Sequence, residues 1–147
     1  MATDSDMKSA LIGDVGTDVS PGLLLALKSL TAWPVDAFAV DLKDSRDQSV
    51  VWIQGNAIGI LTATDNFDAP TLKAVVRPVR TIISVDVEPR FIDRHPSASV
   101  DRNVAVVFTS GEPIKLDVGK FAAAHYRDRA NEFIAAVLRA VAEPNRD

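Results

Sequence analysis

The clearest pattern in the chain is a change in the spacing of its apolar residues. From Ala37 onward, apolar and polar positions alternate in short runs, and this period of two is typical of β-strands. Over residues 120–142 the spacing becomes three and four, and the apolar stripe consists of Tyr126, Ala130, Phe133, Ile134, Val137, Leu138 and Val141. This spacing predicts an amphipathic helix that covers a sheet with its apolar face.

A shorter helix is predicted before the strands. Ser20 and Pro21 have the residue types of an N-cap and a first helical position, and a leucine-rich run follows and ends before Pro34. Residues 1–19 are rich in Asp, Ser, Thr and Gly, which indicates a flexible arm. We therefore expect one domain over residues 20–142, preceded by this arm and followed by a short tail at 143–147.

The first half of the strand region predicts two hairpins. Strands at 37–42 and 50–53 are separated by a polar run at 43–48, which we expect to be an exposed loop. Gly55 and Asn56 then form a pair typical of tight turns, and the alternation resumes at 58–62. Residues 71–77 and 79–87 are rich in β-branched residues and predict strands around Pro78, although a helix over 69–76 is an open alternative.

The second half contains one long loop and one further hairpin. Residues 88–99 include Pro89 and Pro96 and predict a loop. Alternation at 104–108 and 114–118, with a turn at 110–113, predicts a hairpin. These patterns together predict an α+β fold: an antiparallel sheet or partly open barrel of about seven strands, with a short N-terminal helix and a capping C-terminal helix.

Composition narrows the classes of function. The chain has 16 basic and 20 acidic residues and a net charge of -4, which argues against a nucleic-acid partner. It contains no cysteine, so thiol catalysis and thiolate metal sites are excluded. Its apolar runs are shorter than a membrane span and Asp4 and Asp6 stand near the N-terminus, so we expect a cytoplasmic protein without stable membrane insertion.

The candidate catalytic and metal-binding groups form no recognisable constellation. His95 follows Asp86, Glu88 and Asp93 at irregular spacing in a segment with two prolines, so no catalytic residue and no metal ligand is predicted there. The common glycine-rich nucleotide motifs and the nucleophile elbow of hydrolases are absent from the sequence. We therefore expect no cofactor.

The order of about seven strands and one final helix over residues 36–142 resembles the pleckstrin-homology-like fold. Lipid-binding members of that superfamily carry clustered basic residues between the first two strands, whereas this loop has Lys43 and Arg46 beside Asp44 and Asp47. The resemblance therefore implies a protein or peptide partner. The chain is also similar to small acidic secretion chaperones, whose order of elements would require the helix at 69–76.

The predicted function is a noncatalytic protein- or peptide-interaction domain. Its candidate binding site is an edge strand over 71–77 that accepts an added strand from another chain, with Lys73, Val75, Arg77 and Arg80 as binding residues. A proline at Val75 is expected to weaken partner binding or homodimer formation and to leave the fold largely intact. The alternatives are a small amphipathic ligand bound between sheet and helix, and an enzyme that uses the loop at 86–95.

Overall fold

The computed structural model describes residues 4–12, 18–44, 46–94, 97–121 and 124–142 and has an α+β architecture. Its α-helices are α1 (Asp4–Ile12), α2 (Pro21–Leu30) and α3 (Ala124–Ala142). Its strands are β1 (Ala37–Asp44), β2 (Asp47–Gln54), β3 (Ala57–Thr64), β4 (Thr71–Pro78), β5 (Ile82–Arg94), β6 (Ser97–Phe108) and β7 (Ile114–Asp117). Two short 3-10 helices, η1 (Val79–Thr81) and η2 (Val118–Lys120), follow β4 and β7.

The strands form two open antiparallel sheets, in agreement with the predicted α+β class. The first sheet has the order β1-β2-β3-β4 and the second has the order β5-β6-β7. Each sheet is thus a simple meander, and η1 carries the chain from one sheet to the other. The Gly55-Asn56 turn joins β2 to β3 as predicted, and Gly55 has a φ of 58°, which a glycine adopts without steric cost.

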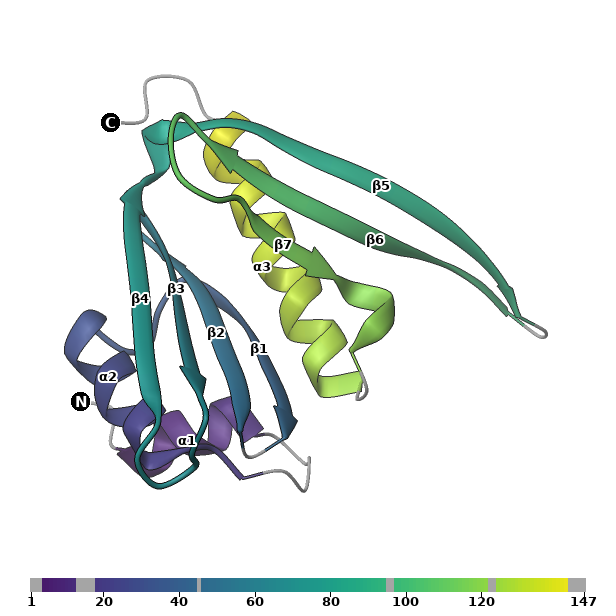
Figure 1. Cartoon of the computed structure of the whole chain (residues 1–147). Coiled ribbons are helices and arrows are strands. Elements are labelled where there is room, and N and C mark those ends of the chain that lie inside the picture. The colour runs from purple at the N-terminus through teal and green to yellow at the C-terminus, as the bar shows by residue number, and fades with distance from the viewer. Residues whose placement is uncertain (1–3, 13–17, 45, 95–96, 122–123, 143–147) are drawn as a thin grey trace.

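The helices cover opposite faces of the first sheet (Figure 1). Helix α3 packs mainly along β1, and α2 packs against β3 and β4 on the other side. Gln48 joins the start of α2 to this second face, because its side chain accepts from the Ser20 N–H at 2.8 Å and donates to the Asp18 carbonyl at 2.8 Å. The long β5–β6 hairpin extends away from the helices and the first sheet.

The apolar stripe of α3 forms the centre of the core. Phe133, Ile134 and Val137 are buried together with Ala39 of β1, which lies opposite Val51 on the α3 face of the first sheet. The second sheet joins the same cluster through Val104 and Val106 of β6. The helix predicted from spacing is therefore integral to the packing, and its α-helical part begins at Ala124, after η2.

Two predictions about the N-terminal region are corrected. Residues 4–12 of the segment expected to be a flexible arm form α1, and Met7 and Leu11 of this helix are buried in the core. Their spacing of four residues places both on one helical face, which a composition dominated by small and acidic residues conceals. Ser20 does not cap α2 with its side chain; its hydroxyl donates instead to the Phe67 carbonyl at 2.6 Å.

Two predicted loops are wrong because the strands extend into them. The polar run at 43–48 is mostly strand, and Gln48 is buried because its amide satisfies backbone groups beside α2. The segment 88–99 is largely strand as well, since β5 reaches Arg94 and β6 begins at Ser97. Pro89 is compatible with β5 because this strand lies at the edge of its sheet.

Residues 71–77 are strand and not helix. This observation removes the element order that the secretion-chaperone resemblance requires.

Among the helices of the described residues, none combines the length and apolar character needed to cross a bilayer.

Candidate functional site

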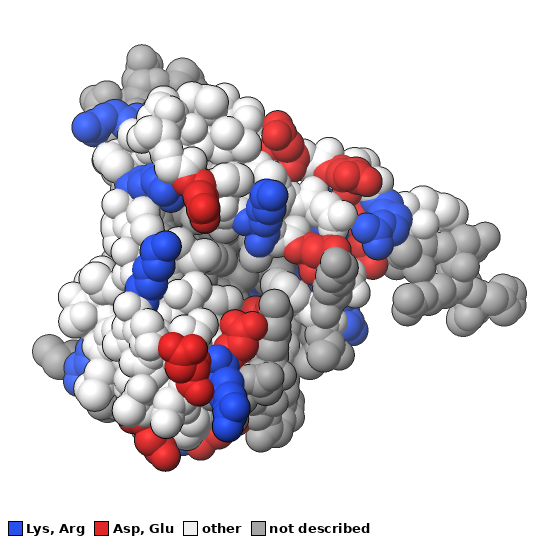
Figure 2. Space-filling model, in the orientation of Figure 1, with Lys and Arg blue, Asp and Glu red and all other residues white. Residues whose placement is uncertain are grey.

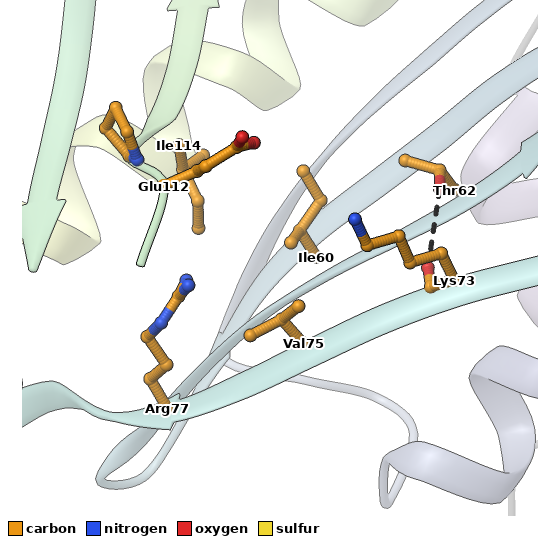
Figure 3. A pocket seen from close by; sticks show the side chains of 8 residues that line it. Ile60, Thr62, Lys73, Val75, Arg77, Glu112 and Ile114 are labelled. Carbon is orange, nitrogen blue, oxygen red and sulfur yellow. Dashed lines mark hydrogen bonds between the residues drawn. The ribbon is translucent and has the colours of Figure 1, made fainter. Parts of the chain in front are cut away.

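A groove lies where the two sheets meet, between the surface of β3 and β4 and the turn from β6 to β7 (Figure 3). Its volume is about 150 Å³. The residues that line it are Ile60, Thr62, Lys73, Val75, Arg77, Glu112, Pro113 and Ile114. Two segments that are far apart in sequence, the β3–β4 hairpin and the turn from β6 to β7, thus contribute to one surface, and β4 supplies its basic side chains.

The alternation of β4 explains why its basic residues share this surface. Lys73 lies opposite Thr62 and Val75 lies opposite Ile60 in the ladder with β3. Directly opposed residues of an antiparallel pair point to the same face of the sheet, and so do residues two apart in one strand. Lys73, Val75 and Arg77 therefore project together into the groove, as Figure 3 shows.

The backbone of β4 has one free edge. Among the described strands, β4 is paired only with β3. The Val79 N–H donates to the Asn56 carbonyl at 2.7 Å, and this pair continues the register of Ala57 with Pro78. Hydrogen-bonded and non-hydrogen-bonded pairs alternate along an antiparallel ladder, so the residues whose backbone groups face β3 are 71, 73, 75 and 77. The N–H groups that point to the open edge consequently belong to Leu72, Ala74 and Val76.

Arg77 is held in place by aromatic and backbone contacts. Its guanidinium carbon lies 4.4 Å from the centre of the Phe108 ring, within the range of a cation–π interaction. Its terminal nitrogen also occupies the space that a side chain at Gly111 would fill, and Gly111 has a φ of 86°. The positive φ favours glycine at this turn, and a larger side chain there would displace the Arg77 guanidinium. The guanidinium is positioned before any partner binds.

The electrostatic character of the groove is positive along β4. Within the described residues, neither Lys73 nor Arg77 forms an ion pair. Glu112 is the acidic residue that lines the groove, and it belongs to the opposite wall. Figure 2 shows that basic and acidic side chains are otherwise interspersed over this face of the molecule. The two neighbouring cations on β4 thus differ from the rest of this face, where charges of both signs alternate.

The other face of β4 is apolar and partly uncovered. Leu72 and Val76 are 44% and 46% exposed. They alternate with the groove residues and so point to the side of the sheet on which α2 packs. The edge of β4 thus has an amphipathic environment: basic on one face and aliphatic on the other.

The structure brings together three of the four predicted binding residues. Lys73, Val75 and Arg77 line the groove, whereas Arg80 is an exposed residue of η1 outside it. Sequence reasoning missed Ile60 and Thr62, although extending the hairpin register from the loop at 65–70 would have placed them opposite β4. The sequence predicts the turn that contains Glu112, but no local pattern indicates its approach to β4, which depends on how the two sheets meet.

The residues considered for catalysis or metal binding are not gathered into a site. Asp86 and Glu88 are exposed on β5, and His95 lies outside the described residues. In the part of the chain that the structure describes, His, Asp and Glu side chains form no group of three that could hold a metal ion.

One buried hydroxyl stands apart from the groove. The Tyr126 hydroxyl has no hydrogen-bond partner among the described residues. Burial raises the pKa of Tyr126, and the negative charge of Asp41 raises it further. A neutral tyrosine with a raised pKa is a poor nucleophile and a poor general base, so this hydroxyl is a packing group without evident chemistry.

Comparisons with known proteins provide no relative from which a function could be transferred. The sequence matches no model of a protein family and no curated protein, and the fold matches no solved structure. The geometry of the groove and of the β4 edge is therefore the basis for a function.

Proposed function

We propose that this protein is a noncatalytic peptide-interaction domain that binds an extended segment of another chain as a fifth strand beside β4. The observation that supports this proposal is the free edge of β4, whose outward N–H groups at Leu72, Ala74 and Val76 can pair with an added backbone. The groove beside this edge supplies contacts for alternate side chains of the added strand.

The other edges of the two sheets are less suited to strand addition. Ala37–Val40 and Leu42 of β1 are buried, whereas most of β4 is exposed. Strand β5 has an irregular register between Ile82 and Ser84 and contains Pro89, both of which protect an edge from pairing. Strand β7 has only four residues. The regular eight-residue ladder of β4 is therefore the preferred position.

The pleckstrin-homology-like resemblance is part of this proposal. Meanders of four and three strands followed by a terminal helix support it, as does the strand conformation of residues 71–77. The mixed charges of residues 43–47, where β1 ends and β2 begins, favour a protein partner over a phosphoinositide. A segment of a protein partner is also the ligand that an open strand edge recognises best.

A small amphipathic ligand fits the structure less well. The interface between α3 and the first sheet is filled by buried side chains such as Phe133, Ile134 and Val51. The groove beside β4 has a volume of about 150 Å³, below the range of roughly 300–1,000 Å³ that is usual for small-molecule sites. A space of this size is suited to side chains of a larger partner that lies along the groove.

Selection from a displayed library of random peptides tests the proposal and requires no identified partner. Peptides would be selected on the wild-type domain, and their affinities would be measured for Ala74→Pro and Ala74→Ser. The proline removes one outward N–H, whereas the serine retains it at the same position. We expect Ala74→Pro to abolish binding and Ala74→Ser to preserve it, with both variants folded by circular dichroism. Equal binding to both variants would contradict strand addition at β4.

A further inference from the structure

We propose that the segment bound by β4 is acidic, with carboxylate side chains four residues apart that face Lys73 and Arg77. The inference rests on the proposed strand addition and specifies its ligand. In an added strand, the residues opposite Lys73, Val75 and Arg77 point into the groove, because opposed residues share a face. Four residues of strand span about 13 Å, so one ligand strand reaches both cations.

The charges on β4 favour carboxylates at these two positions. Lys73 and Arg77 form no ion pair within the described residues, so an incoming carboxylate displaces no internal partner. Arg77 is already oriented by the Phe108 ring at 4.4 Å and by its contact with Gly111. An oriented guanidinium loses little side-chain freedom on binding, which favours a specific carboxylate contact.

The residue between the two acids is aliphatic. The middle of the groove consists of Ile60, Val75 and Ile114, and Figure 3 shows Val75 between the basic side chains of β4. Glu112 lines the same groove from the opposite turn and would repel a third carboxylate. The groove face of the ligand is thus acidic, aliphatic and acidic at alternate positions.

The opposite face of β4 adds a second requirement. Leu72 and Val76 are 44% and 46% exposed, and an added strand would cover them with the side chains that point away from the groove. These intervening ligand positions therefore favour apolar residues. The ligand is an amphipathic extended segment and not a uniformly acidic tail.

The same charges disfavour one form of self-association. If β4 paired with β4 of a second copy about Val75, Lys73 would lie opposite the partner's Arg77. Like charges in directly opposed positions are destabilising. An acidic segment of another protein satisfies the two cations, whereas this arrangement of a second copy does not.

Three fluorescent peptides of one design test the inference. Each has nine residues, alternates threonine and valine at its ends, and has isoleucine at its fifth position. The third and seventh positions are both Glu, both Gln or both Lys. We expect the Glu peptide to bind the wild-type domain roughly tenfold more tightly than the Gln peptide, with a difference that falls as salt is added, and the Lys peptide to bind most weakly.

Charge reversal on the protein provides the decisive comparison. Lys73→Glu with Arg77→Glu should prefer the Lys peptide, and the control Arg80→Glu should keep the wild-type preference because Arg80 lies outside the groove. Equal affinity of all three peptides, with binding lost in Ala74→Pro, would overturn the acidic ligand and retain strand addition. A Glu preference that survives Ala74→Pro would overturn strand addition. Two further results would overturn the acidic ligand. The first is that no peptide binds at millimolar concentration. The second is that the wild-type protein is a dimer and Ala74→Pro converts it to a monomer.

Discussion

Gly59 lies directly opposite Trp52 in the ladder between β2 and β3, and the indole ring occupies the space that a side chain at Gly59 would fill. Trp52 is only 1% exposed and is surrounded by the core, so the ring has no free volume into which to move. The absence of a side chain at Gly59 is therefore what permits a tryptophan at this position.

We expect Gly59→Ala to lower the free energy of unfolding by about 1–3 kcal/mol, because overpacking displaces the indole or the strand. Chemical denaturation measures this change. In the background of Trp52→Phe, which has a smaller ring, the same glycine substitution should cost less, and the difference gives the coupling between the two sites. Equal costs in the two backgrounds would show that the indole is not what Gly59 accommodates.

A second prediction concerns the role of α3 in the core. A chain that ends at Gly119 loses Phe133, Ile134 and Val137, which are buried in the structure. Each contributes roughly 1.5–3 kcal/mol, against a total stability of about 5–15 kcal/mol for a domain of this size. We expect this fragment to show no cooperative thermal transition by circular dichroism, whereas a chain that ends at Ala142 should melt cooperatively. A folded, monomeric fragment 1–119 would contradict the packing role of α3.

The elements that the sequence predicts well are those with a strong local period. The stripe of α3 and the alternation at 104–108 and 114–118 are visible because buried positions recur with a regular period among more accessible ones. The sequence predicts the inner ends of β5 and β6 but not their continuation through 88–99, where Phe91 and Val100 are 67% and 57% exposed and give no contrast between an apolar and a polar face. Pro89 then suggested a loop.

The sequence predicts the β4 part of the candidate site but not the opposite wall, for a related reason. Lys73, Val75 and Arg77 share a face by their spacing of two, which sequence alone reveals. Glu112 and Ile114 reach the same groove only because the two sheets meet at η1, and no local pattern encodes that angle. Arg80 is close to these residues in sequence, but it belongs to η1 and lies outside the groove.

The buried Tyr126 hydroxyl makes a third prediction possible. It has no hydrogen-bond partner among the described residues, so Tyr126→Phe removes a polar group that the fold does not satisfy. We expect the free energy of unfolding at neutral pH to stay within about 1 kcal/mol of wild type or to rise. A loss of more than about 2 kcal/mol would show that the hydroxyl has a structural partner.

The raised pKa of Tyr126 predicts the dependence on alkaline pH. Above its ordinary value of 10.0, the unfolded tyrosine ionises while the folded one keeps its proton, because burial and then Asp41 raise its pKa in the folded chain. Wild type should therefore lose stability relative to Tyr126→Phe as pH rises through 10 toward the folded pKa. The chain has one tyrosine, so the difference in tyrosinate absorption between the two proteins reports this titration directly.

The last prediction separates the two sides of the β4 backbone. The register directs the Val75 N–H to β3 and the Ala74 N–H to the open edge, so a proline affects the two positions differently. The sequence predicts that a proline at Val75 leaves the fold largely intact. The register shows instead that Ala74 is the position where a proline should be tolerated. We expect Val75→Pro to lower the free energy of unfolding by at least about 1–3 kcal/mol, since it removes a ladder hydrogen bond and leaves a carbonyl of β3 without its donor.

Ala74→Pro should cost less than about 1 kcal/mol, because proline is tolerated where its nitrogen faces solvent on an edge strand. Urea denaturation of both variants, with Ala74→Ser and Val75→Thr as controls that retain the N–H, measures the contrast. Val75→Thr isolates the loss of a partly buried aliphatic group from the loss of the hydrogen bond. If Ala74→Pro proves as damaging as Val75→Pro, the Ala74 N–H is engaged inside the fold, and β4 has no free edge for a partner strand.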